Sequence, residues 1–517
     1  MGQHNDDAFT DHAFLQLRNV IRSLGRGGGS MTPSIYESAQ VLRYCPELVE
    51  IDKVVDWLLR QQRPDGGWGQ EEVPLYRIVP TVAAILGLES LGSHERLHQA
   101  CMAGQRFLEE QDGPVESSDG EYLPVAIELI LPRLLDEADS RGISLPRTNY
   151  RHIEELGSKR RRLLAQCPPP PNSAPMFSWE AWGEHPDPEL VTSAGVGHSP
   201  AATAWWLHLA KGQCAKKATY TKAIDHIINA SYAGESGIRG LVPNAWPMNR
   251  FEQSFVLYTL LNAGLLSSPR LADILIPQLE SLRLAMRPTG LGHSDYFAPD
   301  GDDTAAAVAV LAGAGLPVNY SVLTSFERSD HFVAYPFETH SSHTVTARAT
   351  QALALGGHCV TPWRRSIERA QWADGWWASD KWNCSRVYGT SIALTALDES
   401  AKRAKEAAIS AFLEYQRADG GWGCFGKSTM VETALGVLAL CNTAVDSDCA
   451  PACTQAINAA HRLLHRKYNN HHIGIEQLWI CKDLYSAKRV DHAIILSALL
   501  AANKDTPVRI HGATIAL

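Results

Sequence analysis

Hydrophobic residues recur at three- and four-residue spacing along most of the chain, which is the period of an α-helix with one buried face. A first helix is predicted at 9–24. The other segments with a clear helical period are 81–91, 201–211, 304–313, 391–401, 433–441 and 491–502. Alternating runs of β-branched residues, which would indicate strands, are few. The pattern therefore predicts an all-α fold.

A short motif of Gln, Gly and Trp interrupts the helical pattern at intervals. Its copies lie at 57–69, 371–377 and 412–423, with a weaker copy at 107–113. In each copy the end of a predicted helix leads into glycines that permit positive φ, and a Trp follows in the three clear copies. We expect the Gln to cap the turn and the Trp to pack over the next helix. Copies in both halves predict two similar helical barrels, and 517 residues exceed a single core.

Composition narrows the class of protein. A net charge of -9 argues against a nucleic-acid partner. The 11 Cys form no CxxC pair, so we expect neither a disulfide framework nor a structural zinc site. The chain starts with polar and acidic residues, and its longest apolar stretch is too short to cross a bilayer. These features predict a cytoplasmic protein without stable membrane insertion, and they leave the oligomeric state open.

Crowded carboxylates are the clearest sign of chemistry. Asp300, Asp302 and Asp303 stand at the start of a predicted helix. N-capping by Asp303 or Thr304 explains one acid but not three. Crowding makes it costly to ionise all of them, so one is expected to hold a proton at neutral pH. A neutral carboxylic acid beside aromatic faces can protonate an alkene and leave a stabilised carbocation.

The chain resembles class II terpene cyclases, most closely bacterial copalyl and drimenyl diphosphate synthases. The resemblance runs nearly end to end. It rests on the DxDD stretch 300–303 and on matching stretches at 64–69, 128–132, 178–183, 199–204, 243–247, 380–382 and 478–485.

The resemblance implies two α/α barrels, called γ and β, with a substrate cavity between them. The expected domains are the first β helix at 1–26, the inserted γ barrel at 30–240 and the β barrel at 241–517. It also implies that Asp302 is the proton donor, with Asp300 and Asp303 orienting it and returning its proton. The substrate is a linear prenyl diphosphate that keeps its diphosphate while rings close.

A diphosphate site is implied as well, with Mg²⁺ as the expected cofactor. Solvated loop charge and ordinary ion pairs remain alternative explanations for these side chains. The candidate metal ligands are Glu116, Asp119, Glu121 and Glu128. The candidate diphosphate-binding cations are Lys159, Arg161, Lys381 and Lys482.

Two positions depart from the family. Phe177 stands where copalyl diphosphate synthases have a His, which with Asn244 holds the water that takes the last proton. Trp205 stands where related bacterial sequences have a small residue. Together with Trp179 and Trp246, these side chains either shorten the cavity or pack the barrel. The sequence-based preference is a short cavity, hence C15 farnesyl diphosphate and a drimenyl product; the alternative is C20 geranylgeranyl diphosphate and a copalyl-type product.

Different protein classes explain less of the pattern. A protein prenyltransferase subunit shares the barrel but needs Asp, Cys and His zinc ligands, which show no such spacing here. A carbohydrate-active helical barrel or a non-enzymatic helical scaffold would also be built from helices. Neither predicts the DxDD placement together with the 478–485 stretch.

Overall fold

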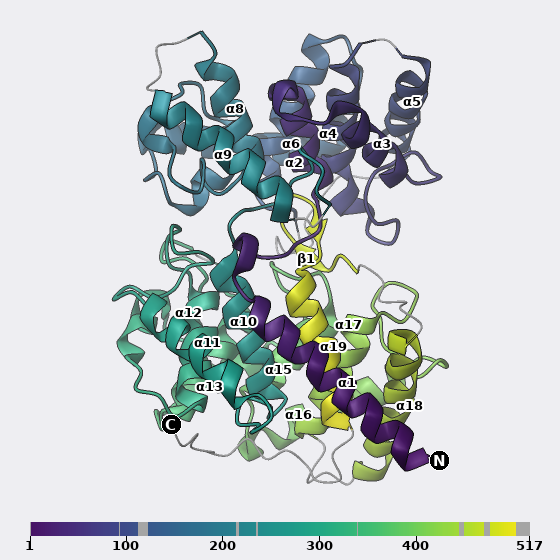
Figure 1. Cartoon of the computed structure of the whole chain (residues 1–517), viewed down its shortest axis with the longest axis vertical. Coiled ribbons are helices and arrows are strands. Elements are labelled where there is room, and N and C mark those ends of the chain that lie inside the picture. The colour runs from purple at the N-terminus through teal and green to yellow at the C-terminus, as the bar shows by residue number, and fades with distance from the viewer. Residues whose placement is uncertain are drawn as a thin grey trace.

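The computed structural model describes residues 2–92, 94–111, 123–212, 217–233, 236–338, 340–443, 449–469 and 476–502, with side chains from residue 8 onward. It consists almost entirely of helices in two stacked groups (Figure 1). The all-α prediction is confirmed. Within the described residues, no helix is both long enough and apolar enough to cross a membrane.

A closed ring of inner helices forms the lower barrel. Each helix contacts the next, and the last contacts the first. In ring order they are α10 (Asn249–Asn262), α12 (Gly301–Gly313), α13 (His343–Leu355), α15 (Arg386–Thr395), α17 (Met430–Thr443) and α19 (Lys488–Ala502). Nearly every residue of these helices is buried, because the outer helices cover the side of each that faces away from the barrel axis.

Outer helices surround this ring. They are α11 (Ala272–Ala285), α14 (Thr361–Arg369), α16 (Lys402–Tyr415) and α18 (Ala450–Asn469). The first helix, α1 (Gly2–Ser23), packs on α19 and α11, so the start of the chain belongs to the lower barrel. Its core combines residues 9–31 with residues 251–501.

The upper barrel has a separate hydrophobic core, formed by residues between 35 and 242; Val73 and Tyr76 of the same range pack into the lower core instead. Its inner ring closes through α2 (Ile35–Tyr44), α4 (Ile78–Glu89), α6 (Ile127–Ser140), the 3₁₀ helix η5 (Ala174–Ala181) and α8 (Pro200–Ala210). The outer helices are α3 (Ile51–Gln61), α5 (Glu95–Glu109), α7 (Arg151–Gln166) and α9 (Lys217–Ala233). The residue limits proposed for the domains stay a prediction.

Extended segments join the barrels. The backbone N–H of Ser34 donates to Val242 O at 2.8 Å, and that of Met248 donates to Gly28 O at 2.7 Å, so the outgoing and returning segments lie side by side. A hairpin of β1 (Trp479–Ile480) and β2 (Leu484–Tyr485) lies at the same junction. The hydrophobic pattern did not predict this hairpin, because each strand has only two residues.

The Gln–Gly–Trp motif forms one repeated staple. The indole N–H groups of Trp68, Trp377 and Trp422 each donate, at 2.7, 2.7 and 2.8 Å, to the carbonyl ten residues earlier. In the three clear copies the Gln donates both to the turn glycine and to a neighbouring helix; Gln416, for example, bonds Gly420 O and Ala456 O, each at 2.8 Å. The neighbouring Trp of the 371–377 motif, at position 376, instead packs edge-on against Phe412.

The expected helix at 391–401 is displaced. The structure has a helix at Arg386–Thr395, because Ser385 caps its start by accepting from Val387 N at 3.2 Å. Asp398 then caps a separate short turn by accepting from Ser400 N at 2.9 Å. The apolar segment 391–401 therefore spans the end of the helix Arg386–Thr395 and the short turn that follows it.

Trp422→Ala should lower the free energy of unfolding by about 3–5 kcal/mol, since it opens a cavity and leaves Phe412 O without its donor. Thermal denaturation followed by circular dichroism measures the loss. The matched control is Trp372→Ala, because Trp372 belongs to a sister motif but is 49% exposed. Equal melting temperatures for the two variants would contradict the staple.

Candidate functional site

The aspartates of the DxDD stretch meet at the upper end of the lower barrel. The loop that precedes α12 is held against the helix by Leu291, whose backbone N–H donates to Thr304 Oγ1 in the first turn of α12 at 2.9 Å. Gly301 N donates to Ala334 O at 2.7 Å, and a Cβ at Gly301 would lie 2.3 Å from Val333 O. Only glycine fits between the two segments, so this contact fixes the first turn of α12 and the carboxylates on it.

Asp300 is the N-cap of α12. Its Oδ1 accepts from Asp303 N at 2.8 Å, so the expectation that Asp303 or Thr304 caps this helix is wrong. The helix starts one residue after Asp300, and the capping position falls there. Asp303 points to α10 and accepts from Ser254 Oγ at 2.7 Å. Two of the carboxylates therefore have partners at the helix start.

Asp302 has a different partner. Its Oδ1 accepts from Arg348 Nη1 at 2.5 Å, and the side chains of Asp302 and Arg348 are 11% and 1% exposed. Arg348 lies on α13 and also donates to the hydroxyl of Tyr388. The middle aspartate is the least buried of the DxDD carboxylates.

Burial and mutual repulsion keep protons at this site. Burial, with the charge of Asp303 beside it, raises the pKa of Asp300 well above its usual value. Burial raises the pKa of Asp303 to about 7. Burial also raises the pKa of Asp302, while Arg348 opposes the rise. The cluster can therefore hold a proton near neutral pH, as expected from the crowding of its charges.

Aromatic rings pack next to this ion pair. Trp479 of the hairpin has ring centroids 5.3 Å from Phe251, 5.7 Å from Phe255 and 5.3 Å from Tyr388. The guanidinium of Arg348 lies 4.6 Å from the Phe255 ring. Aromatic faces attract positive charge, so this cluster suits a reaction that passes through cations.

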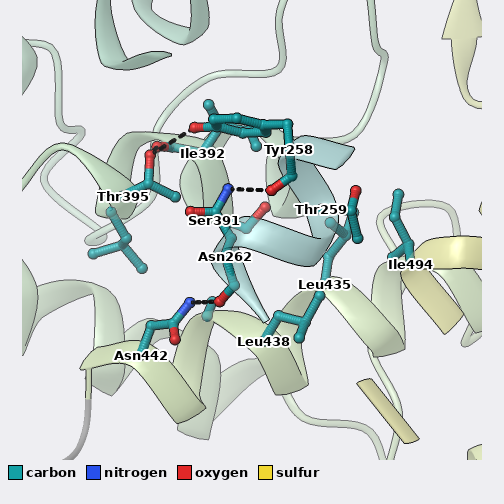
Figure 2. A pocket seen from close by; sticks show the side chains of 12 residues that line it. Tyr258, Thr259, Asn262, Ser391, Ile392, Thr395, Leu435, Leu438, Asn442 and Ile494 are labelled. Atoms are coloured by element: carbon teal, nitrogen blue, oxygen red, sulfur yellow. Dashed lines mark hydrogen bonds between the residues drawn. The ribbon is translucent and has the colours of Figure 1, made fainter. Parts of the chain in front are cut away.

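A small cavity of about 50 Å³ lies toward the opposite end of the barrel (Figure 2). It is lined by the last turns of α10 and α15 and by α17. Tyr258 OH bonds Thr395 Oγ1 at 3.1 Å, and Asn442 Nδ2 donates to Asn262 O at 2.9 Å. The volume suits one or two water molecules rather than a prenyl chain, so this cavity is not a substrate site.

Lys482 does not lie on an open surface. It is fully buried between the carboxylates of Glu37 and Glu180, at 2.7 Å from each, and donates to Ser199 Oγ at 2.7 Å. Burial raises the pKa of Glu37 to about 8 despite the lysine. The ion-pair alternative for Lys482 therefore agrees with this geometry better than diphosphate binding does.

Lys381 lies closer to the acidic cluster. Its Nζ pairs with Glu338 Oε2 at 2.5 Å, and the lysine side chain is 21% exposed. Its charge also acts on the pKa of Asp302. Of the predicted cations, Lys381 is the one that the structure brings near the DxDD residues.

Lys159, Arg161 and Glu128, the described candidates that remain, lie on the upper barrel. Lys159 is exposed and Arg161 half-buried on the outer helix α7. Glu128 pairs with Arg160 at 2.6 Å, so its carboxylate is already neutralised. Glu116, Asp119 and Glu121 lie outside the described residues. Among the described residues no group of His, Cys, Asp and Glu side chains could hold a metal ion.

Asn244 and Phe177 lie at the junction of the barrels. Asn244 is fully buried; its Nδ2 donates to Asp483 Oδ1 at 2.7 Å, and its Oδ1 accepts from Asp483 N at 3.4 Å. The Phe177 ring lies 4.3 Å from Lys482 Nζ. A ring that cannot accept a proton thus covers the buried lysine, at the position where the resemblance leads us to expect a His.

The tryptophans expected at the cavity have packing partners. Trp205 stacks on His208 with centroids 5.4 Å apart and donates to Gly183 O at 2.8 Å, both within the upper barrel. Trp179 is buried in the same core. Trp246 donates to Gly27 O at 2.7 Å in the connecting segments. None of these contacts reaches the DxDD residues, so they give no support to a shortened cavity.

Comparison with known proteins decides the family. The chain is 41% identical to a (+)-kolavenyl diphosphate synthase of Herpetosiphon aurantiacus over 502 residues, which are 94% of this chain and 96% of that protein. The chain belongs to the class II terpene cyclases. It is 29% identical to a copalyl diphosphate synthase of Streptomyces cyslabdanicus, over 94% and 96% of the two chains. No protein-family model matches this cyclase.

The fold of this class II cyclase is that of a solved relative. The ent-copalyl diphosphate synthase of Streptomyces platensis superposes with a TM-score of 0.77 at 24% identity, covering 95% of this chain and all of that one. This similarity confirms the predicted fold, a pair of α/α barrels.

Several residues of the cyclase site were missed in the sequence. Arg348, Tyr388 and Ser254 surround the aspartates but lie on other helices, 40 or more residues apart along the chain. One signal was available: Arg348 is the single Lys, Arg, Asp or Glu residue in the segment 343–355. A lone charge on a buried apolar helix is rarely tolerated without a partner.

In this cyclase, Lys482→Met should lower the free energy of unfolding by about 3–5 kcal/mol, because Glu37 and Glu180 lose their buried counter-ion. Thermal denaturation measures the effect. The control is Lys427→Met, which removes a lysine that is 71% exposed and pairs with Glu72; it should cost less than about 1 kcal/mol. A raised KM for the diphosphate substrate with unchanged stability would instead restore the anion-binding interpretation.

Proposed function

We propose that this class II cyclase converts a C20 prenyl diphosphate, geranylgeranyl diphosphate, into a bicyclic diphosphate of the copalyl or kolavenyl type. The observation that carries the proposal is the 41% identity to a kolavenyl diphosphate synthase over nearly the whole of both chains. A copalyl diphosphate synthase matches over a similar span. Both named products are C20 diphosphates, so the relatives favour the C20 substrate over farnesyl diphosphate.

The packing of the upper barrel removes the argument for a C15 substrate. The preference for a C15 substrate rested on Trp205 and Phe177 as residues that shorten the cavity. Trp205 is engaged with Gly183 and His208, and Phe177 covers Lys482. Neither contact gives a reason for a short cavity, and the farnesyl and drimenyl interpretation loses its structural argument.

Asp302 is the proposed proton donor. It transfers its proton to the terminal alkene and becomes a carboxylate, and the cation formed closes two rings by successive carbon–carbon bonds. A proton then leaves the last cation, so substrate and product are isomers and the carbon–oxygen bond to diphosphate stays intact. Asp302 suits this role because it does not cap the helix, and it is the least buried of the three acids.

Asp300 and Asp303 form the proposed proton store. They are joined through Asp300 Oδ1 and Asp303 N, and burial raises the pKa of both. A pair that holds a proton near neutral pH can return one to Asp302 after each turnover. The aromatic cluster of Phe251, Phe255 and Trp479 is the proposed wall that stabilises the ring cations.

Further residues are proposed for the final proton loss and for binding of the diphosphate. Asn244 with Asp483 is the proposed polar neighbour of the final proton loss, since Phe177 cannot act as a base. Lys381 is the proposed cation for the diphosphate, with Lys159 and Arg161 as further candidates. Mg²⁺ would neutralise the diphosphate, but Glu128 is paired with Arg160 and does not fit as a free ligand; no step depends on the metal.

Substrate choice is tested by incubating the purified chain separately with geranylgeranyl and farnesyl diphosphate. The products are treated with phosphatase and identified by mass spectrometry. We expect a bicyclic C20 alcohol and a higher kcat/KM for the C20 substrate. A higher kcat/KM for farnesyl diphosphate would overturn the proposed substrate and return the drimenyl interpretation.

Asp302→Asn should reduce kcat by at least about 10²–10⁴, because the amide cannot supply the acid proton. Product formation per folded molecule is the measurement. Asp295→Asn is the matched control, since Asp295 lies in the same loop, pairs with Arg250 at 2.7 Å and is 43% exposed. Near-normal cyclisation by Asp302→Asn would remove Asp302 from the proposed role.

A further inference from the structure

The indole of Trp479 joins the aromatic rings that lie next to the DxDD residues. Its plane stands at 86° to Phe251, 69° to Phe255 and 70° to Tyr388, with ring centroids 5.3, 5.7 and 5.3 Å away. These are edge-to-face contacts, and their attraction depends on the angle between the rings. A rotation of this one indole would therefore disturb all three contacts.

The backbone on either side of Trp479 is held by the loop that faces the hairpin. Ile480 N donates to Trp382 O at 2.9 Å, and Cys384 N donates to Leu478 O at 2.9 Å. These bonds place the Cα of Trp479 but do not set its side-chain torsions, which can occupy several rotamers. The plane of the indole needs a restraint of its own.

Asp491, in the first turn of α19, supplies that restraint. Its Oδ1 accepts from Trp479 Nε1 at 2.9 Å, and its Oδ2 accepts from Ser486 Oγ at 2.5 Å. Asp491 is only 6% exposed, so its carboxyl group depends on these partners. Burial raises the pKa of Asp491 to about 7, whereas the bonds from Ser486 and Trp479 lower it. Both bonds therefore stabilise the carboxylate form, as charge-assisted bonds do.

We propose that Asp491 is a positioning residue for the carbocation steps: by accepting the indole N–H it fixes the plane of Trp479, and with it the aromatic wall along which the rings close. This inference rests on the proposed function, in which Phe251, Phe255 and Trp479 stabilise the ring cations. It concerns the cations that form after protonation by Asp302, and not the protonation itself.

A misoriented wall has a specific chemical consequence. Each ring cation either adds to the next alkene, or loses a proton to form an alkene, or captures water and then loses a proton to form an alcohol. Aromatic faces lower the energy of the cation where they meet it. When the wall tilts, the second ring closure slows relative to the two losses, and monocyclic and hydroxylated diphosphates accumulate.

The test is the product mixture of Asp491→Leu, which replaces the carboxyl group with an apolar group that accepts no hydrogen bond. Products formed from geranylgeranyl diphosphate are treated with phosphatase, separated by gas chromatography and identified by mass spectrometry. We expect the share of monocyclic and hydroxylated products to rise about two- to thirtyfold, the range that one cation–aromatic contact contributes to a rate. Total kcat should stay within about tenfold, because the acid is intact. A wild-type mixture from folded Asp491→Leu would overturn the proposal.

Asp491→Asn is the conservative variant, because its amide oxygen can still accept from the Trp479 N–H. Its share of early products should stay within about twofold of the wild type, since the indole keeps its acceptor. A share as large as that of Asp491→Leu would overturn the proposal.

Ser486→Ala carries the test if Asp491→Leu does not fold. It removes the donor that holds Oδ2 and leaves the carboxyl group free to turn. The share of early products should rise at least about twofold, the lower end of the range for one cation–aromatic contact. An unchanged mixture would overturn the proposal.

The matched control breaks another buried indole hydrogen bond of the same barrel. Trp422→Phe removes the bond from Trp422 Nε1 to Phe412 O at 2.8 Å, so it should lower the melting temperature and leave the product mixture unchanged. A rise of similar size in Trp422→Phe would show a general effect of stability and overturn the proposal.

Asp302→Asn separates the two levels of the argument. Retained cyclisation by Asp302→Asn would defeat the proposed function, and this inference with it. Lost cyclisation by Asp302→Asn, together with a wild-type mixture from Asp491→Leu, would defeat this inference alone.

Discussion

All inner helices of the lower barrel start at the same end, and the first turns of those helices leave backbone N–H groups that need acceptors. Asp300 supplies one acceptor for α12, Ser342 one for α13 and Ser385 one for α15. Glu476 accepts from Met430 N and Val431 N at the start of α17. The positive ends of the helix dipoles favour negative charge at the same rim. The need to cap parallel helices thus gathers polar and acidic groups where the barrel meets its neighbour, and the DxDD residues belong to that rim.

The rim also explains why the acids differ. Asp300 is committed to capping, Asp303 to Ser254, and Asp302 to Arg348. Three chemically identical carboxyl groups within four residues acquire different environments because each faces a different element. Asp300 faces its own helix, Asp303 faces α10 and Asp302 faces α13. As a result, the Asp300–Asp303 pair retains a proton, and the Arg348 cation lowers the pKa of the third acid, Asp302. Acid catalysis requires such a difference in pKa between neighbouring groups.

Local signals in the sequence predicted much of this fold. The 3.6-residue period gave the helices, and the Gln–Gly–Trp motif gave the staples, because both depend on neighbours within one hairpin. The sequence failed where neighbours are distant. Arg348 could not be assigned to Asp302 from a separation of 46 residues, and Lys482 resembled a free cation because Glu37 and Glu180 lie 445 and 302 residues away. The drimenyl preference lacks support for a related reason, because the distant packing partners of Trp205 decide whether its side chain can shorten a cavity.

The side-by-side connections between the barrels have a consequence for how such a chain can be assembled. The chain leaves the lower barrel near Gly28 and returns at Met248, and these residues share a backbone hydrogen bond of 2.7 Å. Seen from the lower barrel, the roughly 220 residues between these positions form a loop whose two ends are in contact. The entropy cost of closing a loop increases only slowly with its length. An entire second barrel can be carried as an insertion between α1 and α10 without interrupting the inner ring, which starts at α10. Two adjacent tethers also restrict rotation of one barrel on the other more than a single linker would, which keeps the facing rims in register.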